Sequence, residues 1–150
     1  MNTKRLKIDA ASGRGFEIIA EVPDIRMHIQ GRTLEELFCN ALRGMASYMA
    51  PGKIGARGGR IAEAVMIRAV DINSLLVEFL SEAIARAYGR DALFTTATFR
   101  VFGENFLEGE IAGSPTDARA RDVRAVSYLN VDIKKSRETG FFETDLILEV

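Results

Sequence analysis

Two apolar stripes at helical spacing constrain this chain of 150 residues more than any other feature, because its remaining hydrophobic residues alternate as they do in strands. Thr33 opens the first stripe, and Glu36 three residues later completes a capping box that satisfies early backbone donors. Pro51-Gly52 then stops the helix. The stripe consists of Leu34, Leu37, Phe38, Ala41, Leu42, Met45 and Met49. Its breadth predicts a helix that packs on a core.

The second helix follows the same logic. Asp71 or Asn73 can cap its start, and Gly89 is expected to end it. Its apolar positions are Leu75, Leu76, Phe79, Leu80, Ala83, Ile84 and Ala87. These residues face one side, so this segment is predicted to be a second core helix.

The rest of the chain reads mostly as strands. Expected strands cover 16–20, 25–30, 61–70, 93–102, 106–112, 124–134 and 141–150. Runs of strands after two separated helices favour an α+β fold over a doubly wound parallel sheet. No repeat or long linker divides the chain. We therefore expect one domain over residues 1–150, with two core helices packed on a largely antiparallel or mixed β-sheet.

Composition narrows the function. The formal charge of −1 arises from 20 basic and 21 acidic residues, so no global field draws the protein to nucleic acid or to a membrane. No segment is long and apolar enough to cross a bilayer, and we expect a cytoplasmic protein. Cys39 is the single cysteine. Its place in an apolar stripe predicts a small buried hydrophobe rather than a catalytic thiol, because nothing nearby would depress its pKa.

Two basic segments each leave two interpretations. The glycine-rich loop at 51–60 is expected to be a connector, since a phosphate cradle needs a helix to follow and a strand is predicted there instead. Arg119, Arg121 and Arg124 alternate with acidic residues. Such mixtures are usually solvated faces, and a partner-docking patch is the alternative.

Five segments together carry a family resemblance. They are Glu21-Val22-Pro23-Asp24-Ile25, Thr33-Leu34-Glu35-Glu36-Leu37-Phe38, Leu75-Leu76-Val77-Glu78-Phe79-Leu80, Arg124-Ala125-Val126-Ser127-Tyr128 and Leu148-Glu149-Val150. In this order and spacing they resemble the archease family, small accessory proteins that assist an RNA ligase. The match extends from about residue 16 to the end of the chain and implies an archease-like α+β domain.

The resemblance implies a cation site. In that family an Asp after the first strand meets an acidic penultimate residue and the terminal carboxylate, which correspond here to Asp24, Glu149 and Val150. An all-oxygen ligand set favours Ca²⁺, with Mg²⁺ second, and disfavours zinc. Alternation along the last strand turns Glu149 away from the core face, as a ligand requires. Without the resemblance, Asp24 would read as a turn residue and Glu149 as an exposed strand residue.

The chain also departs from the family pattern. Glu21 and Leu129 stand where the family has histidines, Arg124 stands where it has lysine, and Glu149 stands where it usually has aspartate. Glu21, Arg124 and Tyr128 are additional candidates for the site or for partner contacts. His28 does not occupy either histidine position and is expected to be a solvent-facing strand residue.

The resemblance implies a function without enzymatic activity. An archease promotes guanylylation and turnover of an RtcB-type RNA ligase in tRNA splicing or RNA repair, so the expected partner is that protein, with RNA contacted only indirectly and no membrane involved. The alternative is a chaperone-like binding module for an RNA-modifying enzyme. A divalent-metal hydrolase is the weakest hypothesis, because the candidate site offers no second base or nucleophile.

Overall fold

The computed structural model describes residues 15–20, 24–51, 60–116 and 119–150. Its elements are, in chain order, β1 (Phe16–Ala20), β2 (Ile25–Gly31), α1 (Leu34–Met49), β3 (Ile61–Arg68), α2 (Ile72–Arg90), β4 (Ala92–Phe102), β5 (Phe106–Pro115), β6 (Ala125–Ser127), β7 (Lys134–Lys135) and β8 (Phe142–Glu149). The predicted α+β class is confirmed. Every strand pair among the described residues is antiparallel.

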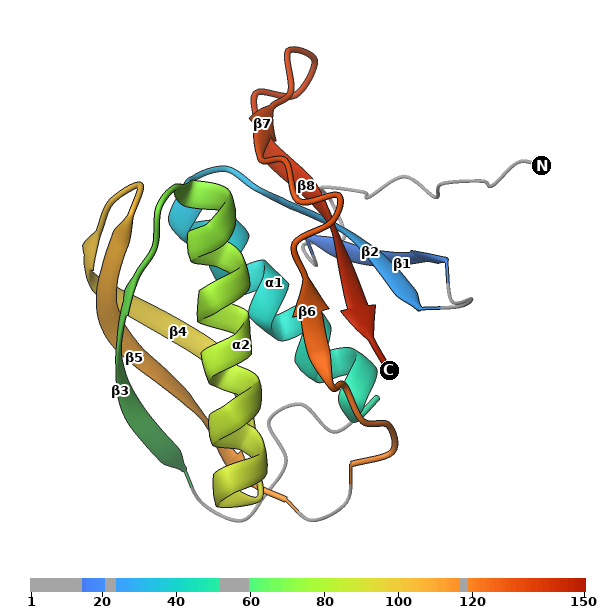
Figure 1. Ribbon diagram of the computed structural model, residues 1–150, viewed down its shortest axis with the longest axis vertical. Coiled ribbons are helices and arrows are strands. Elements are labelled where there is room, and N and C mark those ends of the chain that lie inside the picture. The colour runs from blue at the N-terminus through green and yellow to red at the C-terminus, as the bar shows by residue number, and fades with distance from the viewer. Residues whose placement is uncertain (1–14, 21–23, 52–59, 117–118) are drawn as a thin grey trace.

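The strands form two sheets with the helices between them (Figure 1). The first sheet has the order β1-β2-β8-β6, with β7 also paired to β8, and the second has the order β3-β5-β4. Helix α1 contacts β2 of the first sheet and β4 of the second, while α2 contacts β3, β4 and β6. Strand β8 therefore lies inside the first sheet, with β2 on one side and β6 and β7 on the other.

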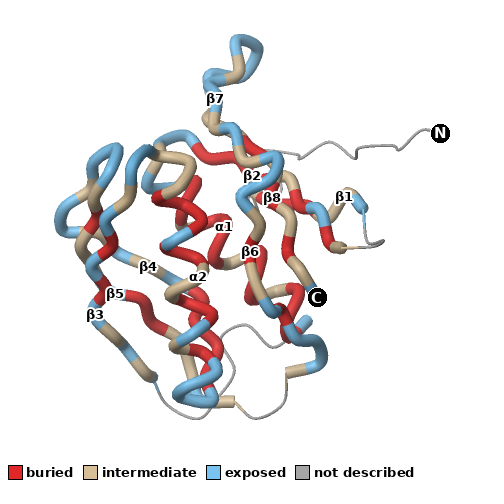
Figure 2. The backbone as a smooth tube through the Cα atoms, in the orientation of Figure 1, coloured by how far each residue is buried: buried red, intermediate tan, exposed pale blue. Residues whose placement is uncertain are grey.

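One hydrophobic core joins the helices to both sheets, and the buried positions line the inner faces of these elements (Figure 2). Phe38 of α1 is fully buried, and its ring meets Phe79, Phe99 and Phe102 at centroid distances of 5.7, 6.4 and 5.0 Å. Large aromatic side chains contribute much of a core's energy because each buries a large apolar area. This cluster ties α1 to α2 and β4.

The start of α1 confirms the predicted cap and changes one partner. The Glu36 backbone N–H donates to Thr33 Oγ1 at 3.0 Å, as a capping box requires. The Glu36 side chain accepts from the Arg32 backbone N–H at 2.5 Å. In a standard capping box this carboxylate accepts the backbone N–H of the cap residue itself, which here is Thr33. The carboxylate therefore ties Arg32, the residue before the cap and the first position between β2 and α1, to the helix.

Two predicted boundaries were wrong. Helix α2 runs through Gly89 and ends at Arg90, because Asp91 adopts the left-handed conformation, with φ of 50°, that closes the helix. The single strand predicted over 124–134 is divided into β6 and β7. Asn130, with φ of 69°, lies in the turn between them. Aspartate and asparagine tolerate this region better than most residues, so neither boundary needs a glycine.

Asp71 is the cap of α2, and Asn73 instead accepts a hydrogen bond from the Ile133 backbone N–H at 2.9 Å. The Ser74 backbone N–H donates to Asp71 Oδ1 at 2.8 Å and holds the pKa of that carboxyl below its ordinary value of 3.8. Because the folded pKa is lowered, the stabilisation is present above the ordinary value and is lost as pH falls through the folded value.

We therefore expect Asp71→Ser to lose less stability in acid than the wild type, because serine caps a helix but does not titrate. Urea unfolding at a series of pH values from about 6 to about 2 measures this difference. Asp132→Ser, which changes an exposed acid outside the helices, is the control. Parallel pH profiles of wild type and Asp71→Ser would contradict the assignment.

Some predicted features lie outside the described residues. These are Glu21, Pro23 and nearly all of the basic glycine-rich loop, whose residues 52–59 are not described. Neither helix in the described ranges is long and apolar enough to span a membrane.

Candidate functional site

The candidate carboxylate site lies where β8 ends between the start of β2 and the start of β6. Antiparallel pairing places Ile25 opposite Leu148 and Ala125 opposite Glu149. Asp24 precedes Ile25, so it lies one step beyond the ladder at the same end of the sheet as Glu149. The fold thus brings the start of β2 and the end of β8 together at the same end of the first sheet (Figure 1).

Asp24 contacts the end of the chain directly. The Val150 backbone N–H donates to Asp24 Oδ1 at 3.4 Å, a contact between residues 126 positions apart in the sequence. Asp24 is partly exposed, and Val150 is 43% exposed. A ligand from solvent can therefore reach both groups.

Glu149 is fixed through its backbone. Its carbonyl oxygen accepts from the Arg124 backbone N–H at 2.7 Å, and its strand is paired on both sides. Leu148 is fully buried, whereas Glu149 is only partly buried. Successive strand residues face opposite sides, so the Glu149 side chain leaves the core face, as the sequence pattern predicts.

The donor types at this edge suit a hard cation. In the described ranges, no three side chains of His, Cys, Asp or Glu are grouped closely enough to hold a metal ion. Asp24 and Glu149 offer two side-chain carboxylates, so a cation held here would take its other oxygen ligands from main-chain groups or from water. These are the oxygen ligands that Ca²⁺ and Mg²⁺ accept, and zinc's preferred thiolate or imidazole is missing from this set.

The three additional candidates have different positions. Glu21 lies outside the described residues. Arg124 has an exposed side chain and lies beside the site through its backbone bond to Glu149. Tyr128 follows β6 at the end away from the site, and its hydroxyl donates to Glu78 of α2. Arg124 thus borders the carboxylates, while Tyr128 lies apart from them.

His28 differs from its prediction as a solvent-facing residue. Its side chain is only 12% exposed, with Nδ1 2.7 Å from Asp145 Oδ1 and Nε2 3.2 Å from Glu143 Oε1. The ring lies on the predicted polar side of β2, and facing strand β8 supplies both carboxylates. The alternation in the sequence places all three residues on the polar faces of their strands. Only the register of β2 on β8 makes them neighbours.

Arg119 and Arg121 brace the ends of the helices. Arg119 Nη1 donates to the Ala92 carbonyl at 3.3 Å, and its guanidinium lies 4.3 Å from the ring centre of Tyr88. Arg121 Nη1 donates to the Tyr48 carbonyl at 3.2 Å and lies 4.9 Å from that residue's ring centre. A guanidinium near a helix C-terminus also interacts favourably with the helix dipole. These contacts give both arginines a structural role beyond the two interpretations from sequence.

Cys39 is partly buried. Its thiol donates to the Ala97 carbonyl at 3.3 Å, linking α1 to β4. Burial raises the pKa of this thiol, and the hydrogen bond to Ala97 opposes that shift without overcoming it. A raised pKa keeps the group a neutral thiol, which agrees with the expectation that it is not a nucleophile.

Comparison with solved structures identifies the fold. A protein of Methanobacterium thermoautotrophicum, designated Protein 1598, superposes with a TM-score of 0.69 at 21% identity, over 91% of this chain and 99% of its own. An archease from Thermotoga maritima, described as a possible chaperone, gives a TM-score of 0.61 at 13% identity, over 89% of this chain and 96% of its own. At these identities the likeness shows the shared fold alone.

Sequence comparison gives the family. The model of the Archease protein family (MTH1598/TM1083) matches residues 16–150. A protein archease of Methanosarcina barkeri is 26% identical over 139 residues, covering 86% of this chain and 92% of the relative. A protein archease of Methanosarcina acetivorans is 33% identical over 139 residues, covering 85% and 92%. The chain therefore belongs to the archease family.

Proposed function

We propose that this chain is a non-enzymatic accessory protein that promotes guanylylation and turnover of an RtcB-type RNA ligase in tRNA splicing or RNA repair. It acts through a divalent-cation site made by Asp24, Glu149 and the carboxylate of Val150, with Ca²⁺ as the preferred ion and Mg²⁺ as the alternative. The single observation that supports this most is the hydrogen bond from Val150 N–H to Asp24, because it joins two of the three proposed ligands.

Electrostatics supports a cation in this role. A bound cation would balance the negative charge that these carboxylates bring to one end of the first sheet. A bound cation would supply positive charge and would accept the oxygen ligands that these residues offer. The chain's own groups do the rest: strand pairing fixes Glu149, the Arg124 N–H holds its carbonyl, and Asp24 orients the end of the chain. The result is a preformed surface that favours the ligase state competent for nucleotide transfer.

The decisive experiment is multiple-turnover RNA ligation by an RtcB-type ligase, with GTP and a divalent cation, in the presence and absence of this protein. We expect the wild type to raise the turnover rate and Asp24→Ala to lose most of that increase. Glu104→Ala, which removes an exposed acid from the turn between β4 and β5, is the matched control and keeps full stimulation. An unchanged rate with the wild type would rule out the proposal for this chain.

A second candidate function has its own support. The Thermotoga maritima archease of the same fold is described as a possible chaperone, so we also consider a chaperone-like binding module for an RNA-modifying enzyme. In that role the protein suppresses aggregation of its client, and Asp24→Ala suppresses it equally well. Light scattering of a client enzyme with both forms separates this function from ligase activation.

A further inference from the structure

His28 of β2 contacts β8 through both of its ring nitrogens. Nδ1 lies 2.7 Å from Asp145 Oδ1, and Nε2 lies 3.2 Å from Glu143 Oε1, so each nitrogen faces a different carboxylate. The His28 side chain is 12% exposed, and those of Asp145 and Glu143 are 22% and 35% exposed. We call these three residues the imidazole clamp. The clamp joins β2 to β8 at a place that solvent reaches only in part.

The geometry of the clamp requires a doubly protonated ring. Carboxylates are ionised at neutral pH and then only accept hydrogen bonds. A neutral imidazole has one N–H and donates to one carboxylate, whereas the imidazolium has two N–H groups and donates to both. His28 therefore lies as a cation between two anions. Neither nitrogen then keeps a lone pair for a metal ion, which agrees with the lack of a metal-binding group of side chains in the part of the chain that the structure describes.

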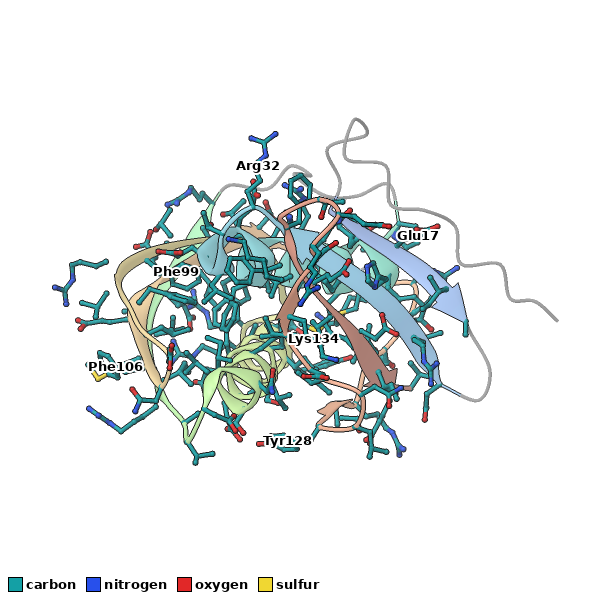
Figure 3. The ribbon with its side chains drawn as sticks, turned by 90° about the horizontal axis from the view of Figure 1, so that it is seen from above. Glu17, Arg32, Phe99, Phe106, Tyr128 and Lys134 are labelled. Atoms are coloured by element: carbon teal, nitrogen blue, oxygen red, sulfur yellow. The ribbon has the colours of Figure 1, made fainter. Side chains whose placement is uncertain are left out.

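A third carboxylate faces His28 from the opposite neighbouring strand. Glu17 of β1 is paired directly with His28 and is 8% exposed. Figure 3 shows Glu17 on β1, the strand at the margin of the first sheet. Directly paired residues of antiparallel strands have Cβ atoms about 4.5–5.5 Å apart, so Glu17 adds negative charge beside the ring. A carboxylate buried to this extent favours a positive charge close to it.

The positively charged side chains around the clamp are exposed. Arg26 lies two residues before His28 on the same face of β2, and it is exposed. Lys134 of β7 is paired with Glu143, is 71% exposed, and forms an ion pair with Asp132 at 3.2 Å. Solvent screens exposed charges more than buried ones. Among the described residues of β1, β2, β7 and β8, the carboxylates nearest the ring therefore outweigh these cations and favour a protonated His28.

We propose that the imidazole clamp is a pH-sensitive device that strengthens the pairing of β2 with β8 while His28 is protonated and weakens it when the proton leaves. Histidine is the side chain that ordinarily changes charge between pH 5 and pH 8. Loss of the proton removes one of the two hydrogen bonds and the positive charge between the carboxylates. The same strand pair places Asp24 beside the end of the chain, so the clamp acts on the pair that builds the candidate site. The device belongs to the fold and does not depend on the ligase.

The direction of the effect follows from proton linkage. The folded chain offers the protonated ring two carboxylates that the unfolded chain does not, so the folded chain binds this proton more tightly. The stabilisation is present at low pH, where both states hold the proton, and is lost as pH rises until both have released it. His28 is the single histidine of the sequence, so its titration is assigned without ambiguity.

Urea unfolding at several pH values tests the device in the full chain without a histidine tag. Between about pH 5.5 and about pH 8.5, we expect the ratio of unfolded to folded protein to rise about tenfold more in the wild type than in His28→Gln, which does not titrate. Glu104→Gln, which neutralises an exposed acid in the turn between β4 and β5, is the control and should keep the wild-type pH dependence. Parallel pH profiles of the wild type and His28→Gln would overturn the proposal.

Nuclear magnetic resonance of the His28 ring nitrogens gives a second test, and it needs no substitution of the ring. At the pH where half of the rings are protonated in concentrated urea, we expect most rings in the folded chain to carry hydrogen on both nitrogens. A protonated fraction no larger in the folded chain than in urea sinks the proposal. Asp145→Asn should lower that fraction in the folded chain, and an unchanged fraction would also contradict the clamp. If His28→Gln does not fold, these spectra decide the proposal by themselves.

Discussion

Asp24→Ala is expected to lower the affinity of this protein for Ca²⁺ at least about tenfold, because it removes a carboxylate that the other proposed ligands cannot replace. In the structure Asp24 also accepts the Val150 backbone N–H, so its removal frees the end of the chain as well. Isothermal titration calorimetry with Ca²⁺ measures the affinity directly. A rise in melting temperature with added Ca²⁺, seen in the wild type and lost in the variant, provides a second readout.

Matched variants make this result specific. Glu104→Ala removes one negative charge from an exposed turn and should leave Ca²⁺ binding unchanged. A chain extended by two glycines after Val150 moves the terminal carboxylate and should weaken binding as Asp24→Ala does. Equal Ca²⁺ affinity in the wild type and in Asp24→Ala would show that this edge is not the cation site.

Phe38→Ala is expected to destabilise the fold by about 3–5 kcal/mol, the usual cost of truncating a fully buried phenylalanine. Its ring contacts Phe79, Phe99 and Phe102, and no part of the side chain is exposed. Urea unfolding followed by circular dichroism gives the free energy of unfolding. The loss is a large part of the stability of a domain of this size, so the variant should unfold at a much lower urea concentration.

Phe106→Ala is the control for this prediction. Phe106 begins β5, is only partly buried, and lies 4.7 Å below the Arg68 guanidinium. We expect it to cost clearly less than Phe38→Ala, because less apolar area leaves the core. A loss for Phe38→Ala no larger than that for Phe106→Ala would show that the aromatic cluster does not hold α1 to the second sheet.

Local sequence signals predicted the elements well where one strong physical cause acts. The cap at Thr33 follows from a side-chain hydrogen bond, and the stop after Met49 follows from proline. Each signal acts within one turn of its own end of the helix. The predictions for the end of α2 and for a single strand over 124–134 were wrong because the local signal for a turn was missing at both places. Asp91 and Asn130 adopt positive φ without a glycine to signal it.

The candidate site came from the family resemblance and not from any local pattern in the sequence. Asp24 and Glu149 were selected through the family resemblance, since acidic residues at strand ends are common surface features. Pairing between distant strands decides which residues lie beside Asp24 and Glu149: Ile25 pairs with Leu148, and Ala125 pairs with Glu149. No local pattern encodes which strands become neighbours.

The sequence by itself determined the two helices, most strands, the α+β class and the family, because caps, periodicity and ordered motifs act over a few residues at a time. Only the tertiary structure decided that the Val150 N–H donates to Asp24 and that His28 lies between Asp145 and Glu143. It also decided that Arg119 and Arg121 donate hydrogen bonds to carbonyl groups near the helix ends. These contacts join residues that are far apart in the chain. Their formation depends on strand register and core packing, which the whole chain settles together.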